Sequence, residues 1–222
     1  MGWLIAIFSV LVICIWLAYI GHKSSVVDWG GRGINWVDGM GRLLCRYLHH
    51  LPETRIPLPD TGAAIVVANH VSGFDPFILL AACRRPLRFL IAREQYERPF
   101  LHWLFKASGC IPVDRSGKPE LALRQALRAI ESGEVLAIFP HGKIHLDSEP
   151  ARKLKGGAVR LSAWTKTPIY PIRINGVGGE GHEVLAAFIP SHVQLKMAAP
   201  ISCSTDNMAE CLDYLARVIE SK

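Results

Sequence analysis

An uncharged apolar run at the N-terminus is the feature that most constrains the fold of this chain. Residues 2–21 contain no Asp, Glu, Lys, Arg or His, and large apolar side chains fill most of the run. A helix rises by about 1.5 Å per residue, so this run spans about 30 Å, the hydrocarbon thickness of a bilayer. We therefore expect residues 1–22 to form a single transmembrane helix that anchors the protein in a membrane.

A cleaved signal peptide is the alternative interpretation of this run. No Lys or Arg precedes the apolar residues, and Ala18-Tyr19-Ile20 is a poor small-residue cleavage site, so a retained anchor is favoured. Basic side chains then outnumber acidic ones in the residues that follow: Lys23, Arg32, Arg42 and Arg46 against Asp28 and Asp38. This excess of positive charge predicts that everything after the anchor faces the cytoplasm.

The rest of the chain is long enough for one domain with its own core. Half of the 222 residues are apolar, which excludes a disordered or fibrous protein. We expect residues 23–59 to be a glycine-rich linker with a short helix at 40–50 and no core, and residues 60–222 to form the domain. The six cysteines show no CxxC pair, and we interpret them as reduced, mostly buried thiols.

Alternating strand and helix patterns predict an α/β domain after residue 60. Short apolar runs with β-branched residues predict buried strands at 63–68, 135–139 and 169–174. Apolar spacing and terminal signals predict helices at 75–82, 119–132, 157–165 and 206–220. This order predicts a largely parallel central sheet flanked by helices and preceded by one N-terminal transmembrane helix.

Two predicted loops carry side chains suited to catalysis. In open α/β sheets, reactive groups collect beyond the C-terminal ends of the strands, where Asn69-His70 and His141-Gly142 lie. His70 precedes Asp75 by five residues, so the carboxylate could accept a hydrogen bond from one imidazole nitrogen and leave the other as a general base. For an isolated pair, however, a helix-capping Asp and a satisfied strand-end His are the more common arrangement.

Four sequence blocks in order favour the catalytic interpretation. Asn69-His70, followed after four residues by Asp75, resembles the NHxxxxD motif of the glycerolipid acyltransferases, the family of 1-acylglycerol-3-phosphate acyltransferase. Further blocks of that family are similar to 109–115 (GCIPVDR), 139–142 (FPHG) and 155–172, which starts with Lys-Gly-Gly and ends in Pro-Ile-Tyr-Pro-Ile. The resemblance covers residues 60–180, and a GxSxG elbow, typical of hydrolases, is absent.

The resemblance implies the roles of the site residues. His70 would deprotonate an acceptor hydroxyl that attacks an acyl thioester, and Asp75 would hold the imidazole. The donor would be acyl-CoA or acyl carrier protein, the acceptor a membrane lysolipid, and no metal or other cofactor would be needed. The expected substrate-binding residues are Asn69, Arg115, His141, Gly142 and Lys143. A solvated charge after a turn is the alternative for Arg115.

The third block departs from the family pattern FPEGTRS. His141, Lys143 and Ile144 stand where the family has Glu, Thr and Arg. The resemblance makes lysophosphatidate the default acceptor, and because of these departures a lysolipid with an amino-acid or sugar head is the alternative. A catalytically silent lipid-binding relative is a further hypothesis.

Other patterns bear on partners. A net charge of +6 suits an anionic partner, but no RNA-binding or helix-turn-helix signature is present, so nucleic acid is not expected. His141 and His145 lack an HExxH glutamate, which disfavours zinc. Residues 88–106 mix aromatic and basic side chains, which is typical of a membrane-surface segment, although core packing explains the aromatics equally well. The oligomeric state stays open.

Overall fold

A computed structural model describes residues 2–115, 117, 119–150 and 152–220. Within them, six strands form one sheet in the order β3-β2-β4-β1-β5-β6, with β6 antiparallel to β5 and the others parallel. The strands are β1 (Ala64–Ala68), β2 (Leu87–Ala92), β3 (Ile111–Val113), β4 (Val135–Ile138), β5 (Ile169–Asn175) and β6 (Gln194–Met197). The predicted largely parallel α/β sheet is therefore confirmed.

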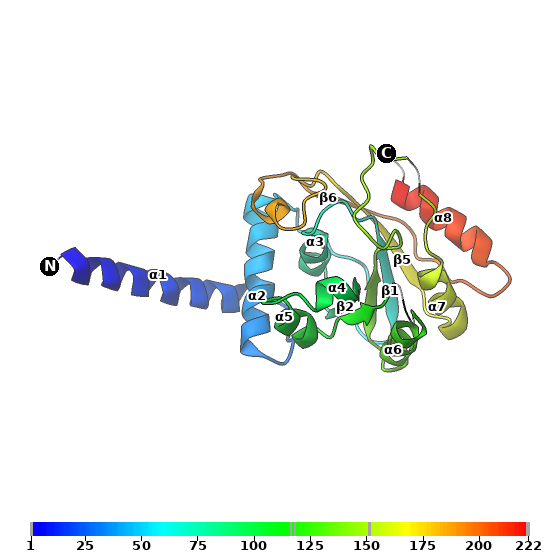
Figure 1. Cartoon of the computed structure of the whole chain (residues 1–222), viewed down its shortest axis with the longest axis horizontal. Coiled ribbons are helices and arrows are strands. Elements are labelled where there is room, and N and C mark those ends of the chain that lie inside the picture. The colour runs from blue at the N-terminus through cyan, green and yellow to red at the C-terminus, as the bar shows by residue number, and fades with distance from the viewer. Residues whose placement is uncertain (1, 116, 118, 151, 221–222) are drawn as a thin grey trace.

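Helices cover both faces of the sheet (Figure 1). The α-helices of the described residues, including α1 outside these layers, are α1 (Gly2–Ser24), α2 (Arg32–Leu43), α3 (Asp75–Ala81), α4 (Arg93–Tyr96), α5 (His102–Ala107), α6 (Pro119–Glu131), α7 (Gly157–Thr165) and α8 (Met208–Glu220). A π-helical turn, η1 (Leu44–Leu48), continues α2, and a 3₁₀ turn, η2 (Leu185–Phe188), precedes β6. The predicted helices at 75–82, 119–132, 157–165 and 206–220 correspond to α3, α6, α7 and α8.

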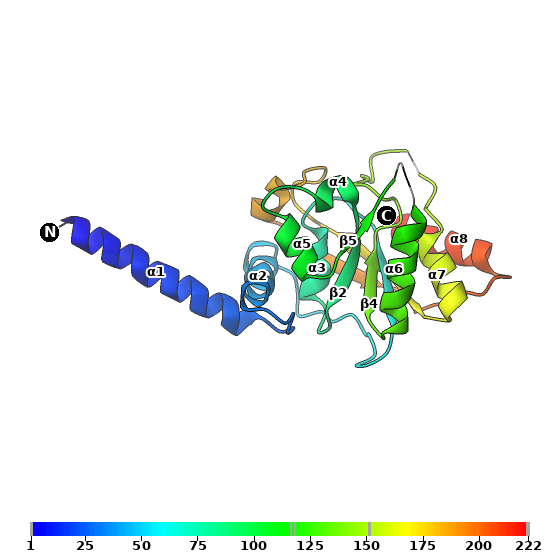
Figure 2. The ribbon, with the colours of Figure 1, turned by 60° about the horizontal axis from the view of Figure 1, so that its bottom comes forward.

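Side chains of the central strand alternate between two cores. Ala64, Val66 and Ala68 of β1 face the core under α2 and α3, whereas Ile65 and Val67 face the core under α6, α7 and α8. Figure 2 shows the same layers after a turn about the long axis. Burial on both faces explains why β1 is continuously apolar, and it holds the loop after β1 on a rigid strand.

The region expected to be a linker contributes to the core, which corrects the sequence interpretation. Its helix α2 begins at Arg32, eight residues before the expected start, and Cys45, Leu51 and Ile56 belong to the core cluster. The glycines permit close packing: a Cβ on Gly39 would overlap the carbonyl oxygen of Gly21. Gly39 and Gly41 of this region therefore mark close contacts of α2 with α1 and α3.

Helix α1 projects away from the body of the molecule (Figure 1). Its residues are exposed except around Gly21, where α2 crosses, and the Trp36 indole N–H donates to the carbonyl of Leu17 at 3.0 Å. Among the described residues α1 is the helix that is long and apolar enough to cross a membrane. The expected N-terminal apolar helix is therefore present, and it extends to Ser24.

Two further expectations need correction. The structure pairs Cys203 with Cys211 in a disulfide at the start of α8, with Cα atoms 6.2 Å apart, so these two cysteines are not free thiols. The stretch 88–106 is not one surface segment: Phe89 lies on β2 in the core, whereas Phe100 and Trp103 are exposed. Strand β2 was missed because its face is only partly apolar, with Arg88 donating to Glu134 at 2.6 Å.

Candidate active site

The loop between β1 and α3 is organised by the carboxylate of Asp75. This side chain is fully buried at the first residue of α3. Its Oδ2 atom accepts hydrogen bonds from the backbone N–H groups of Val71 (2.7 Å) and Ser72 (2.9 Å), and Oδ1 accepts one from the Ser72 hydroxyl (2.7 Å). Asp75 thus turns back to its own loop, and α3 has no side-chain cap.

His70 is oriented by the same carboxylate. Its Nδ1 atom lies 2.9 Å from Asp75 Oδ2. The other partners of the carboxylate all donate to it, as expected for an ionised Asp, which only accepts hydrogen bonds. Nδ1 therefore carries the proton and donates, and Nε2 is left without a proton. The imidazole stacks on the ring of Phe139, with centroids 4.2 Å apart, and 18% of the side chain is exposed. The arrangement therefore fixes the orientation of the imidazole and leaves part of it exposed to solvent.

Asn69 has a different place from the one expected. Its side-chain N–H donates to the carbonyl of Ile174 at 2.9 Å, and its Oδ1 accepts from the N–H of Ile174 at 2.7 Å. Both ends of the buried amide are thus used to join β1 to β5. The structure thus places the Asn69 side chain between two strands, where its polar atoms are already paired.

The third block, which follows β4, meets the first at His70. Phe139 stacks on the His70 ring, and the N–H of His145 donates to the His70 carbonyl at 2.7 Å. Gly142 lies between these contacts with a φ of 72°, where glycine is favoured. The carboxyl ends of β1 and β4 thus bring the two predicted site loops together, as expected for adjacent parallel strands.

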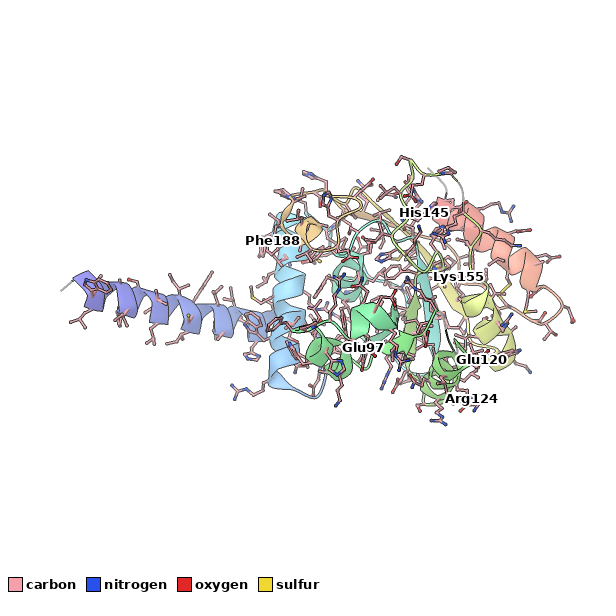
Figure 3. The ribbon with its side chains drawn as sticks, in the orientation of Figure 1. Glu97, Glu120, Arg124, His145, Lys155 and Phe188 are labelled. Atoms are coloured by element: carbon pink, nitrogen blue, oxygen red, sulfur yellow. A yellow bond between two sulfur atoms is a disulfide. The ribbon has the colours of Figure 1, made fainter. Side chains whose placement is uncertain are left out.

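Cationic side chains gather at Gly142. The Arg115 guanidinium donates to the carbonyl of Gly142 and lies 3.2 Å from Glu94 Oε1. A Cβ on Gly142 would stand 2.6 Å from the Lys155 Nζ atom, so the ammonium group of Lys155 is close to the turn. Lys143 is exposed beside them. His145 and Lys155, labelled in Figure 3, both come from the loop between β4 and α7.

His141 does not point to solvent. Its side chain is 2% exposed, with Nε2 3.5 Å from Glu220 Oε1 and its ring 4.5 Å from that of His145. Burial lowers the pKa of His141, and the hydrogen bond to Glu220 partly opposes that effect. The Nδ1 atom is buried without a hydrogen-bond partner in the described part of the chain. His141 therefore joins the loop to α8, in contrast to the binding role expected for it.

Sequence reasoning left two residues out of the site. The sequence indicates Lys155 only as the start of the fourth block, because its approach to Gly142 depends on the tertiary structure. Ser72, whose hydroxyl holds Asp75 and accepts from the N–H of Phe74 at 3.2 Å, carried no signal beyond its place between His70 and Asp75.

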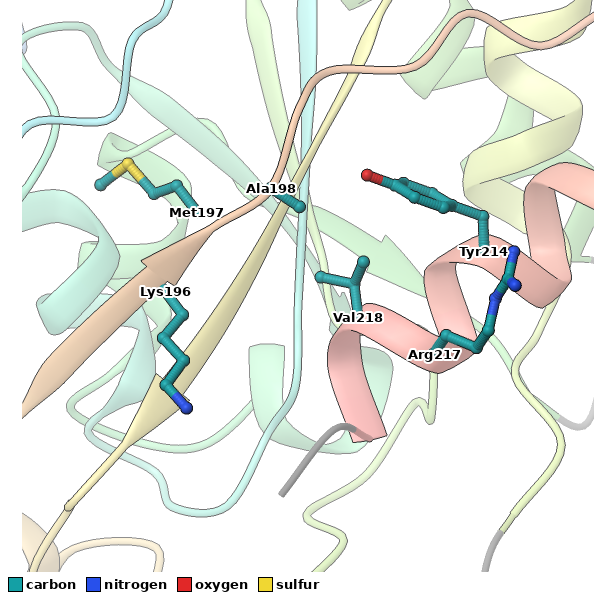
Figure 4. Close-up of a pocket in the computed structure, with 6 residues that line it drawn as sticks. All are labelled: Lys196, Met197, Ala198, Tyr214, Arg217 and Val218. Atoms are coloured by element: carbon teal, nitrogen blue, oxygen red, sulfur yellow. The ribbon is translucent and has the colours of Figure 1, made fainter.

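A hollow of about 490 Å³ lies elsewhere, between β6 and α8 (Figure 4). Its lining consists of Lys196, Met197, Ala198, Tyr214, Arg217 and Val218. None of these residues belongs to the blocks that surround His70. The hollow is therefore separate from the candidate active site.

The fold and the site define a class: an α/β protein with a buried carboxylate and an oriented histidine beyond the ends of parallel strands. A model of the family described as Acyltransferase matches residues 42–175. The chain belongs to this acyltransferase family, which confirms the expected membership.

Two curated proteins are similar to this chain over about half of its length. A probable 1-acyl-sn-glycerol-3-phosphate acyltransferase of Mycoplasma pneumoniae is 35% identical over 127 residues, 54% of this chain and 46% of that protein. The N-acylphosphatidylethanolamine synthase of Arabidopsis thaliana is 31% identical over 124 residues, 51% of this chain and 43% of that protein. The chain thus spans about half the length of these curated relatives.

A solved structure shares the fold. The crystal structure of the 1-acyl-sn-glycerophosphate (LPA) acyltransferase PlsC from Thermotoga maritima superposes with a TM-score of 0.66 and 22% sequence identity. The match covers 85% of this chain and 77% of that one. At this identity the likeness concerns the arrangement of the elements.

Proposed function

We propose that this protein is a membrane-anchored O-acyltransferase that moves a fatty acyl group from an acyl thioester, acyl-CoA or acyl carrier protein, to the hydroxyl of a lysophospholipid such as 1-acylglycerol-3-phosphate. The observation that carries the proposal is the pair His70 and Asp75, joined at 2.9 Å in a chain of the acyltransferase family. Donor, acceptor and anchor are all parts of this proposal.

In the proposed mechanism, Nε2 of His70 removes the proton from the acceptor hydroxyl as its oxygen attacks the thioester carbonyl. A C–O bond forms, and the tetrahedral intermediate then breaks the C–S bond. The imidazolium returns its proton to the departing thiolate, so that a free thiol and an ester result. Asp75 holds the ring orientation and stabilises the imidazolium, and no cofactor takes part.

An anionic head group suits the turn at Gly142. Arg115 and Lys155 bring two cations to it, and Lys143 adds a third nearby charge. Guanidinium groups bind phosphate with fork geometry, whereas ammonium groups act as point charges. These contacts support lysophosphatidate as the default acceptor.

A different acceptor is the second candidate. His141 and Ile144 replace family residues in the third block, and the Arabidopsis relative is named N-acylphosphatidylethanolamine synthase. A lipid with an amino-bearing head group therefore belongs in every acceptor test, beside sugar-headed and amino-acid-headed lysolipids.

The location follows from α1 and the charges after it. We propose that α1 crosses the membrane once and that the domain faces the cytoplasm, because basic side chains outnumber acidic ones between residues 23 and 46. The donor and the acceptor would then meet at the membrane surface.

The test is acyl transfer by the purified full chain in mixed phospholipid–detergent micelles. Free thiol release and new ester are measured with acyl-CoA or acyl carrier protein against a panel of lysolipids. His70→Ala should lower turnover by about 10² to 10⁴, the usual contribution of a general base, while thermal unfolding stays near that of wild type. A folded His70→Ala protein with normal turnover would refute the mechanism.

The same assay tests the catalytically silent alternative, since a lipid-binding relative transfers no acyl group to any acceptor.

Asp75→Asn is the variant matched to His70→Ala. Its amide oxygen can keep the bonds from Val71 and Ser72, and its NH₂ group can donate to the Ser72 hydroxyl, so folding should persist. Turnover should fall, by less than in His70→Ala.

A further inference from the structure

Two loops far apart in the sequence expose large apolar side chains. In the first, 98–103, Phe100 is 92% exposed and Trp103 50% exposed. In the second, 184–189, Phe188 is 67% exposed, and Val184 and Leu185 are similarly open. Exposed apolar groups gathered in this way mark binding surfaces for proteins or membranes rather than chance exposure.

The backbone at Phe100 is strained to present its ring. Its φ of 66° lies in the left-handed region, which costs a bulky residue on the order of 1–3 kcal/mol. No core contact repays this cost, because the side chain is almost entirely in solvent. Strain of this kind gathers at functional positions.

Polar contacts join the two loops into one surface. Glu183 accepts a hydrogen bond from the Gln95 side chain at 3.2 Å and pairs with Arg98 at 2.7 Å. The second loop is fixed from the other side, where the buried His49 ring contacts the Ser191 hydroxyl at 2.7 Å. The first loop is therefore tied through Arg98 to Glu183, the residue that precedes the second loop.

This surface lies on the side of the molecule from which α1 leaves. Figures 1 and 2 show α5 and η2 beside α2, the helix that α1 contacts. Figure 3 places Phe188 there, while Glu120 and Arg124 of α6 lie on the opposite side of the body. The second loop also adjoins the active-site loop, since the N–H of Gly73 donates to the carbonyl of His182 at 3.0 Å.

We propose that loops 98–103 and 184–189 form a second membrane contact, in which Phe100 and Phe188 insert into the headgroup region of the bilayer anchored by α1 and bring the His70 loop to the lipid surface. Both loops lie beside α2, which contacts the exposed apolar helix α1, and lipid is therefore the occupant that we propose. The inference rests on the membrane anchor of the proposed function.

The test measures the depth of a fluorophore on the full chain in vesicles of phosphatidylcholine and phosphatidylglycerol. An environment-sensitive thiol label is placed at Phe100→Cys or Phe188→Cys in a Cys14→Ser background, without reductant. Burial raises the pKa of Cys45 to about 12 and also raises those of Cys83 and Cys110, so these thiols do not compete. The background protein should take up no label.

The fluorescence emission of labels at 100 and 188 should shift to shorter wavelengths when vesicles are present. Lipids that carry a quencher near the headgroup should quench them more than lipids that carry it at the chain end, because interfacial segments lie about 5–10 Å into the boundary. The matched control is Leu121→Cys on α6, an exposed apolar position on the far side, which should be quenched by neither lipid. Quenching at 188 no greater than at 121 would overturn the inference.

Wild type labelled at Cys14 tests the anchor separately. Deep quenching at Cys14 without quenching at 100 and 188 removes the second contact and keeps the anchor. Quenching at 100 and 188 without quenching at Cys14 keeps the second contact and removes the anchor. A blue shift that grows with protein concentration and resists every lipid quencher would assign the surface to a protein partner and overturn the lipid contact.

Discussion

Gly142 lies at a turn that two cationic side chains approach from different elements. Arg115 follows β3 and donates to the Gly142 carbonyl, and Lys155 precedes α7 and reaches the space where a Cβ would stand. The missing side chain leaves room for Lys155. A small anion at this turn would thus meet donors from several parts of the chain, which is the property expected of a head-group site.

The relative weight of the cations is a prediction at the residue scale. Arg115→Ala should raise the Michaelis constant for lysophosphatidate by roughly 10- to 100-fold, because a hydrogen bond to a charged group contributes about 1.5–3 kcal/mol. Lys143→Ala should have a smaller effect, since a single exposed ammonium lacks the fork geometry. Arg124→Ala on the exposed face of α6 is the control and should change nothing. Equal effects of Arg115 and Arg124 would exclude the head-group role.

Histidine 141 gives a prediction about pH. Burial lowers its pKa in the folded state below the ordinary value of 6.5, despite Glu220. As the pH falls through 6.5, the unfolded chain therefore binds a proton that the folded protein does not, and stability decreases. His145 and Arg152 add repulsion that favours the neutral ring.

The measurement is the urea midpoint of the full chain in detergent at pH 7.5 and at pH 5.5, followed by circular dichroism. The midpoint of His141→Gln should depend less on pH than that of wild type. His49, whose pKa is also lowered by burial, contributes equally to both proteins. An unchanged pH dependence would show that His141 titrates alike in the folded and unfolded chain.

The same contacts explain why the third block cannot simply be restored to the family pattern. His141→Glu would bury a second carboxylate near Glu220, which now lies 3.5 Å from the imidazole. Two acids at such a distance repel each other unless one is protonated. At this position the departure from the family pattern is thus linked to α8.

Between elements, the crossing of α1 and α2 depends on glycine. A Cβ on Gly39 would overlap the backbone of Gly21, whereas one on Gly33, also in α2, meets no atom within 4 Å. Gly39→Ala should therefore destabilise the protein by about 1–3 kcal/mol through overpacking. Gly33→Ala should instead stabilise it by up to about 1 kcal/mol through helix propensity.

Thermal unfolding in detergent measures both variants, and their shifts in midpoint should have opposite signs. Limited proteolysis of the segment between α1 and α2 provides a local readout, because cleavage there should increase only in Gly39→Ala. Shifts of the same sign and size would mean that the helices do not rely on this contact.

Strands in the middle of the sheet could be predicted from the sequence, whereas the other strands could not. β1 and β4 lie in the middle of the sheet and are continuous apolar runs, and β5 beside β1 is largely apolar with Arg173 near its end. β2 is interrupted by Arg88, β3 has three residues, and β6 has exposed residues at the edge, so their patterns are weak. These strands form because they pair with neighbouring strands of the sheet, and the local sequence does not show that pairing.

The candidate site was predictable to a similar extent. The spacing of His70 and Asp75 across a strand-to-helix loop could be recognised, as could Arg115. The burial of His141 against Glu220 joins residues 79 positions apart, and nothing in the local pattern points to that contact. Asn69 looked like a binding residue because its neighbour is His70, but its amide is satisfied by β5.

At the scale of the whole molecule, the proposed function needs the active site to face a lipid surface. α1 leaves the body on the side where α2, α5 and η2 lie (Figure 1). A helix that crosses the bilayer would hold this side against the membrane, and the His70 loop adjoins it through His182. The acceptor could then enter laterally from the bilayer while a soluble thioester donor arrives from the aqueous side.

Removal of the anchor tests this arrangement. Deleting residues 2–16 removes most of the apolar helix but keeps Leu17, whose carbonyl accepts from the Trp36 indole, and Gly21 at the α2 crossing. The shortened protein should retain turnover in micelles, because the contacts of His70 lie elsewhere. In cells it should change from a carbonate-resistant to a carbonate-extractable membrane protein, since only the interfacial contacts of loops 98–103 and 184–189 would remain. Immunoblots of washed membranes measure this change, and persistent resistance to carbonate would show that α1 is not the anchor.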